Sequence, residues 1–153
     1  WGITGGSVSP YLPHIKDKDD LHFIQSCFSF ISSTPNALSE QVLKDAQKLF
    51  PTKITHASDI LAPTGFIHGY DLTKVLIAAL NEVKLSDDID ANRLAIKKAL
   101  ENLQTPVAGL VKTYNKPFSS YDPSTPDAHE ALNVDDLCMA KFLPNGDIFV
   151  LAN

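Results

Sequence analysis

Residues Ile67–Val83 read IHGYDLTKVLIAALNEV, and this stretch restricts the folds that the chain can adopt. Its length and spacing predict one helix whose apolar side chains surround it on most sides instead of forming a single stripe. A helix that is apolar nearly all round must also be covered nearly all round. The apolar members are Tyr70, Leu72, Val75, Leu76, Ile77, Ala78, Ala79, Leu80 and Val83.

Two shorter amphipathic helices are predicted on either side of this stretch. The first follows Ser33, with Thr34 as its N-cap and Pro35 at the first helical position, and it ends before Pro51. The second covers residues 90–103, with acidic residues at its start that suit the helix dipole. The side chains expected to be buried are Leu38, Val42, Leu43, Ala46, Leu49 and Phe50 in the first helix, and Leu94, Ala95, Ala99, Leu100 and Leu103 in the second.

Strand patterns lie before the first helix and after the last one. Residues 21–30 and 107–114 each read as one strand, because both are rich in β-branched and aromatic residues. Residues 137–143 and 148–151 flank Asn145-Gly146. An Asn-Gly turn between two apolar runs predicts a β-hairpin.

The helices need more sheet than these strands provide. Helices with wide apolar faces usually cover a parallel sheet built from βαβ units, yet only about four strand segments are present. The chain also begins with Trp1-Gly2-Ile3-Thr4-Gly5-Gly6, which reads like the end of a buried strand running into a glycine loop. We therefore expect residues 1–153 to be the C-terminal part of something larger, whose missing strands come from upstream residues or from a second copy of the chain.

Composition indicates a globular protein and argues against nucleic acid as a partner. Of the 153 residues, 44% are hydrophobic and 20% are charged, and the net charge is −5. Arg93 is the only arginine, the residue favoured for phosphate and base-edge contacts. Cys27 and Cys138 fit no metal spacing, so either both are buried thiols or they form a disulfide, which would require an oxidising compartment.

The sequence predicts no catalytic site, no metal site and no cofactor. No Gly-x-Ser-x-Gly elbow occurs, and the five histidines, His14, His22, His56, His68 and His129, show no metal-like spacing. His68 precedes the long apolar helix and is expected to be a satisfied structural histidine. The acidic loop around His129 leaves a metal open as an alternative, but none of these groups amounts to a site.

The order of several segments resembles that of a known family. The chain resembles the C-terminal part of type I periplasmic binding proteins, specifically the substrate-binding proteins of branched-chain amino acid ABC transporters. The resemblance extends over essentially all 153 residues, and members of the family are about twice this long. The segments that carry it are Phe28-Ser29-Phe30, Pro63–Asp71, Arg93–Leu103, Gly109-Leu110-Val111-Lys112, Met139-Ala140-Lys141-Phe142 and Asn145-Gly146-Asp147.

The resemblance implies an α/β fold with two lobes joined by crossing strands. Its helices would pack on a mainly parallel sheet whose other strands are missing from this chain. Residues 1–30 would supply a strand and the cleft loop of the C-terminal lobe, and residues 31–118 would supply helices and a strand of the N-terminal lobe. Residues 119–153 would form the crossover and a hairpin of the C-terminal lobe.

The resemblance also implies a function without catalysis. The chain would capture a small solute, such as an amino acid or amide, by hinge closure in the periplasm and deliver it to the membrane permease of an ABC transporter. The loop facing the ligand would contain Trp1, Thr4, Gly5, Gly6 and Ser7, where glycines let backbone N–H groups approach closely. Family members that bind amino acids commonly place an acid in this loop, and this sequence has none there. The acid would come from the missing half, or the ligand is not a simple α-amino acid.

Other interpretations stay open. Gly5-Gly6 could simply permit a tight turn, and Trp1 could belong to the core. The same fold could serve as the ligand-sensing domain of a receptor. Alternatively, the chain could be a self-associating interaction module that obtains its missing strands by dimerising.

Overall fold

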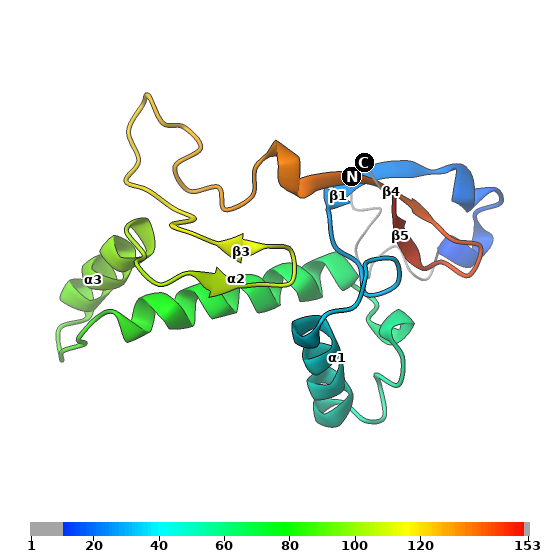
Figure 1. The fold of residues 1–153 in the computed structure, drawn as a ribbon, viewed down its shortest axis with the longest axis horizontal. Coiled ribbons are helices and arrows are strands. Elements are labelled where there is room, and N and C mark those ends of the chain that lie inside the picture. The colour runs from blue at the N-terminus through cyan, green and yellow to red at the C-terminus, as the bar shows by residue number, and fades with distance from the viewer. Residues whose placement is uncertain (1–10, 152–153) are drawn as a thin grey trace. The chain divides into compact units, whose positions relative to one another are not determined.

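The computed structural model describes residues 11–151, a mixed α/β chain whose sheets are small and antiparallel (Figure 1). Its residues form two compact units. The first unit contains the residues up to His68 together with those from Asp136 onward, and the second contains Gly69–Asp135. The helices are α1 (Ala37–Leu49), α2 (Pro63–Asn81) and α3 (Ile89–Glu101); the strands are β1 (His22–Ser26), β2 (Val107–Ala108), β3 (Thr113–Tyr114), β4 (Leu137–Phe142) and β5 (Ile148–Val150).

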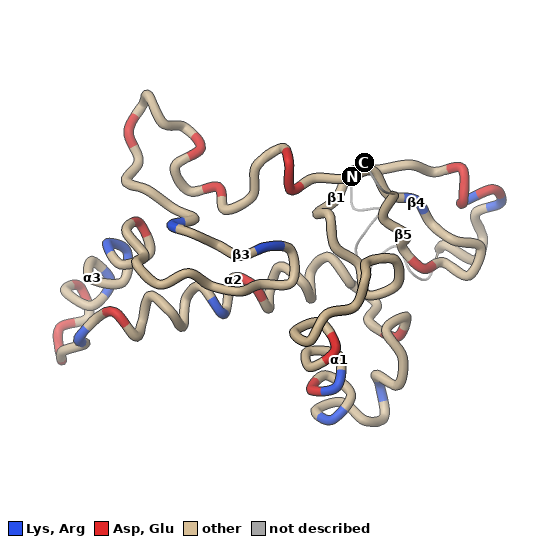
Figure 2. Tube along the Cα trace, in the orientation of Figure 1, with Lys and Arg blue, Asp and Glu red and all other residues tan. Residues whose placement is uncertain are grey.

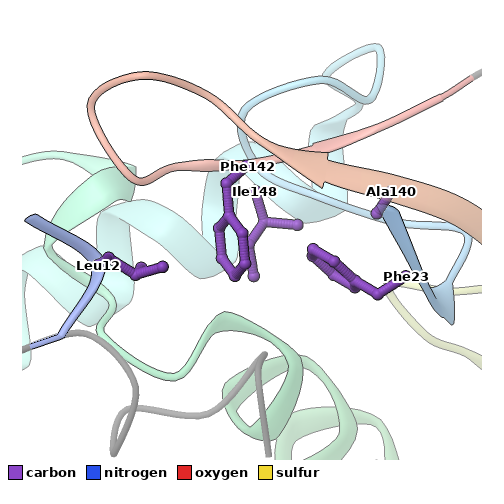
Figure 3. Packing of buried hydrophobic residues seen from close by; sticks show 5 residues of the cluster. All are labelled: Leu12, Phe23, Ala140, Phe142 and Ile148. Carbon is purple, nitrogen blue, oxygen red and sulfur yellow. The ribbon is translucent and has the colours of Figure 1, made fainter. Parts of the chain in front are cut away.

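The first unit is built on a three-stranded sheet in the order β1-β4-β5, with both strand pairs antiparallel. Alternate residues of β4 point to opposite faces, so Cys138, Ala140 and Phe142 are buried while Leu137 and Met139 are exposed. Figure 3 shows Phe23, Phe142, Ile148 and Leu12 gathered on the buried face, and the Phe23 and Phe142 ring centroids lie 4.9 Å apart. This cluster is the core of the first unit.

The β4–β5 hairpin confirms the prediction made from Asn145-Gly146. Gly146 has a φ of 92°, which a glycine adopts without the steric cost that a side chain would bring. The turn closes through a 2.8 Å hydrogen bond from the backbone N–H of Leu143 to the carbonyl oxygen of Asp147. The strand expected over residues 21–30 is shorter than predicted and ends at Ser26. Beyond it, the backbone N–H of Cys27 donates to the carbonyl oxygen of Asp136, and Phe28 turns back onto Ser26.

Helix α1 confirms the predicted helix but corrects its N-cap, which is Asn36 and not Thr34. The Asn36 Oδ1 accepts from the Ser39 backbone N–H at 3.0 Å, and the Ser39 Oγ accepts from the Asn36 backbone N–H at 2.9 Å. This reciprocal capping box satisfies two backbone donors at once. Thr34 has no partner with which it could form such a reciprocal pair. The helix ends at Leu49, as Pro51 requires, but Leu49 and Phe50 are exposed where burial was expected.

Helix α2 begins at Pro63, four residues before the predicted start, and the described residues cover it on one side only. Val75 and Ala79 pack with Leu103, Val107 and Tyr114 in the core of the second unit. On other faces, Leu72, Leu76 and Ile77 are exposed. The sequence predicts that α2 is covered by other elements on nearly all sides, and residues 11–151 do not provide this cover. In α3, Ala99 and Leu100 pack against this core as expected, whereas Leu94 is 52% exposed and the prediction for it is wrong.

The single strand expected over residues 107–114 is wrong, because the chain reverses within it. Val107 pairs with Tyr114 and Ala108 with Thr113 in a short antiparallel hairpin, β2–β3, which runs alongside α2 in Figure 1. Every strand pair among the described residues is antiparallel. The mixed α/β class is confirmed, while the mainly parallel sheet and the division at residues 30 and 118 stay predictions.

Candidate functional site

The ligand-binding residues predicted from the sequence, Trp1, Thr4, Gly5, Gly6 and Ser7, lie outside the described residues. The described chain begins at Tyr11, and Leu12 is the first residue of the buried core. The prediction for the glycine loop therefore stays a prediction. The described part of the first unit still contains a cavity close to this end of the chain, and Leu12 is part of its wall.

This cavity has a volume of about 70 Å³ and is lined by Leu12, Phe142 and three further segments of the first unit. These segments are residues 29–31 after β1, residues 57–63 before and at the start of α2, and residues 146–148 in the β4–β5 turn. Its polar lining comes from Ser29, Ser58 and Asp147. Pockets that enclose a small organic ligand usually measure roughly 300–1,000 Å³. The described residues alone therefore enclose room for a few waters or one small group, and not for a whole amino acid.

The wall of this cavity is held to β5 by serine hydroxyls. The buried Ser29 Oγ donates to the carbonyl oxygen of Ile148 at 3.0 Å and accepts from the Ile31 backbone N–H at 3.1 Å. Ser33 Oγ accepts from the Ser29 backbone N–H at 2.9 Å, and Ser32 Oγ accepts from the Val150 backbone N–H at 2.9 Å. Serine side chains compete with strand pairing for backbone groups, which explains why the predicted strand stops before this segment.

Cys27 and Cys138 are joined by a disulfide, so of the two possibilities left open by the sequence the structure contains the cross-link. Their Cα atoms lie 4.9 Å apart, and the two cysteines are 111 positions apart in the sequence. Both belong to the first unit, one directly after β1 and the other within β4. The disulfide therefore reinforces the β1–β4 pairing, and it was one of the two possibilities that the sequence left open.

Two buried polar atoms of the first unit have no hydrogen-bond partner within the described chain. They are the Ser26 Oγ and the His68 Nε2. A buried polar atom without a partner costs about 1–3 kcal/mol, so such atoms are rare in folded proteins. We expected His68 to be a structural histidine whose ring nitrogens have hydrogen-bond partners. Its Nε2 has none among residues 11–151, so this expectation is not met for that atom.

The second unit contains a buried carboxylate, Asp71, that shapes the β2–β3 hairpin. Asp71 is 1% exposed, and its Oδ1 accepts from the Leu110 backbone N–H at 2.6 Å. Its Oδ2 accepts from the Val111 backbone N–H at 3.0 Å and from the Tyr114 hydroxyl at 2.9 Å. With three donors directed at it, this carboxylate positions the loop 109–112 and makes the chain reverse there. Sequence reasoning missed this role, because the partners lie about 40 residues away from Asp71.

Gly109 lies against this carboxylate so closely that a side chain does not fit. A Cβ at this position would lie 2.6 Å from Tyr114 Cε2 and 2.7 Å from Asp71 Cγ. We expect Gly109→Ala to lower the free energy of unfolding by about 1–3 kcal/mol, because either the ring or the carboxylate must move. Urea unfolding followed by circular dichroism measures the change.

Gly69 provides a matched control for this substitution. A Cβ at Gly69 meets nothing within 4 Å, and the residue lies inside α2. Alanine there is expected to raise stability by about 0.5–1 kcal/mol through helix propensity. Equal effects of the two substitutions would contradict the close packing at Gly109.

Metal binding and membrane crossing find no support in the described residues. No group of three or more His, Cys, Asp or Glu side chains among residues 11–151 is placed to hold a metal ion. His129, on the acidic loop where a metal was an open alternative, instead contacts Glu101 at 3.1 Å. None of the helices in the described range combines the length and the apolar content needed to span a bilayer.

Comparison with known proteins adds no relative from which a role could be transferred. No protein-family model, no curated protein and no solved structure matches this chain at the significance required.

Proposed function

We propose that this chain is part of an extracytoplasmic solute-binding protein that captures a small solute by hinge closure and delivers it to the permease of an ABC transporter. In this proposal the fold is of the type I periplasmic binding class. The helices would cover a mainly parallel sheet completed by strands from upstream residues. The ligand would favour the closed form because it contacts both lobes, and a ligand shifts an equilibrium only by its differential affinity for the two states.

The observation that carries the proposal is the discontinuous organisation of the chain. The first unit is assembled from both ends of the described chain, and the second unit is one continuous segment inserted between them. The chain therefore passes from one unit to the other twice, after His68 and after Asp135. The first of these crossings lies within α2. Hinge closure moves two compact parts of a protein around a ligand, and the two units are candidates for such parts.

Uncovered apolar side chains in both units also support the proposal. In the second unit these are Leu72, Leu76 and Ile77 on α2, and in the first unit they are Ile24 and Met139, which face each other on β1 and β4. Contiguous exposed apolar surface marks places where another element or partner packs. A larger sheet would cover the exposed face of α2, as the resemblance implies.

The disulfide is consistent with a location outside the cytoplasm. Structural disulfides persist in oxidising compartments, such as the bacterial periplasm, and are rare in the cytosol. The disulfide joins Cys27, directly after β1, to Cys138 in β4, which is a structural position. A periplasmic location therefore forms part of the proposal.

A thermal-shift screen of the complete two-lobed protein tests this function. The panel contains amino acids, amides and short aliphatic or aromatic acids. Because a ligand at 100 times its dissociation constant stabilises a protein by about 2.7 kcal/mol, a true solute raises the melting temperature by several degrees. Thr4→Val is expected to reduce this shift, since Thr4 belongs to the predicted cleft loop, whereas Thr52→Val in an exposed turn leaves it unchanged.

A panel without any shift would contradict the proposal. If light scattering then reports a dimer of this chain, the self-associating alternative replaces it. If Thr4→Val and Thr52→Val reduce the melting-temperature shift equally, the protein still binds a solute but the glycine loop is not part of the binding site.

A further inference from the structure

The second unit contains a pocket that the proposed function does not use. It lies between α3 and the loop that follows β3, and its volume is about 470 Å³. This volume falls in the range of roughly 300–1,000 Å³ typical of small-molecule sites. All of its lining residues belong to the second unit, so the pocket does not depend on where the first unit lies.

The floor of the pocket is apolar and firmly supported. It consists of Ile96 and Leu100 from α3 and Phe118 from the loop. All three are half-buried, and Leu100 and Phe118 also pack against the core formed by Val75, Ala79, Leu103, Val107 and Tyr114. Because the core fixes these two side chains, the floor exists before any ligand arrives, and little binding free energy is lost in ordering it.

The rim of the pocket is basic in a chain whose net charge is −5. Arg93, Lys97 and His129 line it, and Figure 2 shows both basic and acidic positions on α3, while most of the few charged positions in the loop after β3 are acidic. The one acid of the lining, Glu101, has a side chain that is only 10% exposed. The exposed charged side chains of the lining are therefore the basic ones, while its acid is largely buried.

Glu101 is fully engaged in holding this rim together. Its Oε1 lies 3.1 Å from His129 Nε2 and 3.3 Å from Lys97 Nζ, and its Oε2 accepts from Ser120 Oγ at 3.4 Å. The hydrogen bond from His129 has the largest effect in holding the pKa of the Glu101 carboxyl below its usual range, and the contacts with Lys97 and Ser120 lower this pKa further. Glu101 thus fastens the loop to α3 and keeps Lys97 and His129 beside the apolar floor.

Arg93 is the rim cation best placed to receive an anion. Its only ion pair in the described residues joins Nη1 to Asp90 Oδ1 at 3.2 Å, and both side chains are largely exposed. Exposed pairs of this kind contribute little, so a ligand can compete with Asp90. The planar guanidinium pairs with a carboxylate through two parallel hydrogen bonds, which a lysine does not offer.

We propose that this pocket binds a small amphipathic carboxylate. An aromatic ring or short branched chain packs on Ile96, Leu100 and Phe118, and the carboxylate binds Arg93. Because Lys97 and His129 are already paired with Glu101, Arg93 is the cation left to receive the ligand, and together with the mostly apolar lining this favours a single carboxylate. The site is separate from the predicted glycine loop and does not rest on the proposed transport function.

Isothermal titration of the 153-residue chain with 3-phenylpropionate tests the proposal, with 3-phenylpropan-1-ol as the uncharged analogue. For a ligand of this size we expect a dissociation constant on the order of 0.1–1 mM. Arg93→Gln is expected to weaken binding of the acid at least about tenfold, consistent with the loss of a charged hydrogen-bond pair. Lys98→Gln is the matched control, because Lys98 is exposed on the same helix and does not line the pocket.

Amide chemical shifts locate the site independently of affinity. The acid should shift the resonances of α3 and of residues 115–133, while those of β1, β4 and β5 stay in place. A flat titration of the wild-type chain would overturn the proposal, as would shifts confined to the first unit. Equal binding of the acid and the alcohol, or equal losses from Arg93→Gln and Lys98→Gln, would overturn the role of Arg93.

Discussion

Replacing Cys27 and Cys138 together by alanine is expected to lower the free energy of unfolding of the first unit by about 3–5 kcal/mol. The disulfide closes a loop between two cysteines that are 111 positions apart in the sequence. A cross-link over such a distance removes many conformations from the unfolded chain, and the entropic estimate for a loop of 100 residues is about 4.7 kcal/mol. The pairing of β1 with β4 then has to be formed without this constraint.

Urea unfolding of the oxidised chain, the reduced chain and the double variant measures the effect. The reduced chain and the double variant should show lower midpoints, and the variant should also show a larger m-value because its unfolded state is less compact. Both cysteines belong to the first unit, but the whole second unit lies between them in the sequence, so the unfolding of each unit is followed separately. Identical midpoints for oxidised and reduced chains would contradict a stabilising role.

Asp71→Ala is expected to destabilise the second unit by about 3–5 kcal/mol, because the substitution leaves several buried donors without an acceptor. Those donors are the backbone N–H groups of Leu110 and Val111 and the hydroxyl of Tyr114. Water cannot easily replace the carboxylate, since the site is buried and Gly109 packs directly against it. The β2–β3 turn should therefore open before the rest of the unit unfolds.

Tyr114→Phe separates the hydroxyl from the backbone contacts. It removes the hydroxyl that donates to Asp71 and leaves the carboxylate with its two backbone donors, so we expect a loss of only about 1 kcal/mol. In the double variant the loss should be smaller than the sum of the two, because the Tyr114–Asp71 bond is counted in both. Urea unfolding and hydrogen exchange at Leu110 and Val111 measure these effects. An Asp71→Ala variant as stable as Tyr114→Phe would contradict the assignment.

The elements that the sequence predicted well have local causes. The β4–β5 hairpin follows from alternating side chains and an Asn-Gly turn within 14 residues, from Leu137 to Val150. The N-cap of α1 was also within reach, because Asn36 and Ser39 have the spacing of a reciprocal cap, but Thr34-Pro35 is an equally good local pattern. Such signals lie within one turn of the chain and need no knowledge of distant residues.

The elements that were missed depend on distant partners. Residues 107–114 carry the composition of a strand, and the chain reverses because Asp71, far earlier in the sequence, accepts from the turn. Periodicity also indicates which face of a helix can be buried and not whether a partner is present, which explains the exposure of Leu49, Leu72 and Leu94. The pocket on α3 escaped notice because Phe118 and His129 reach it from a polar loop without periodicity.

The disulfide has a consequence for limited proteolysis that follows from its place in the chain. Cys27 and Cys138 belong to one unit, while Gly69–Asp135, the whole of the other unit, lies between them in the sequence. A single backbone cut anywhere in that interval opens the chain and still leaves both products covalently joined. A protease acting on the loop after β3 would therefore leave the mass of the chain unchanged except for one added water, and two fragments would separate only after reduction.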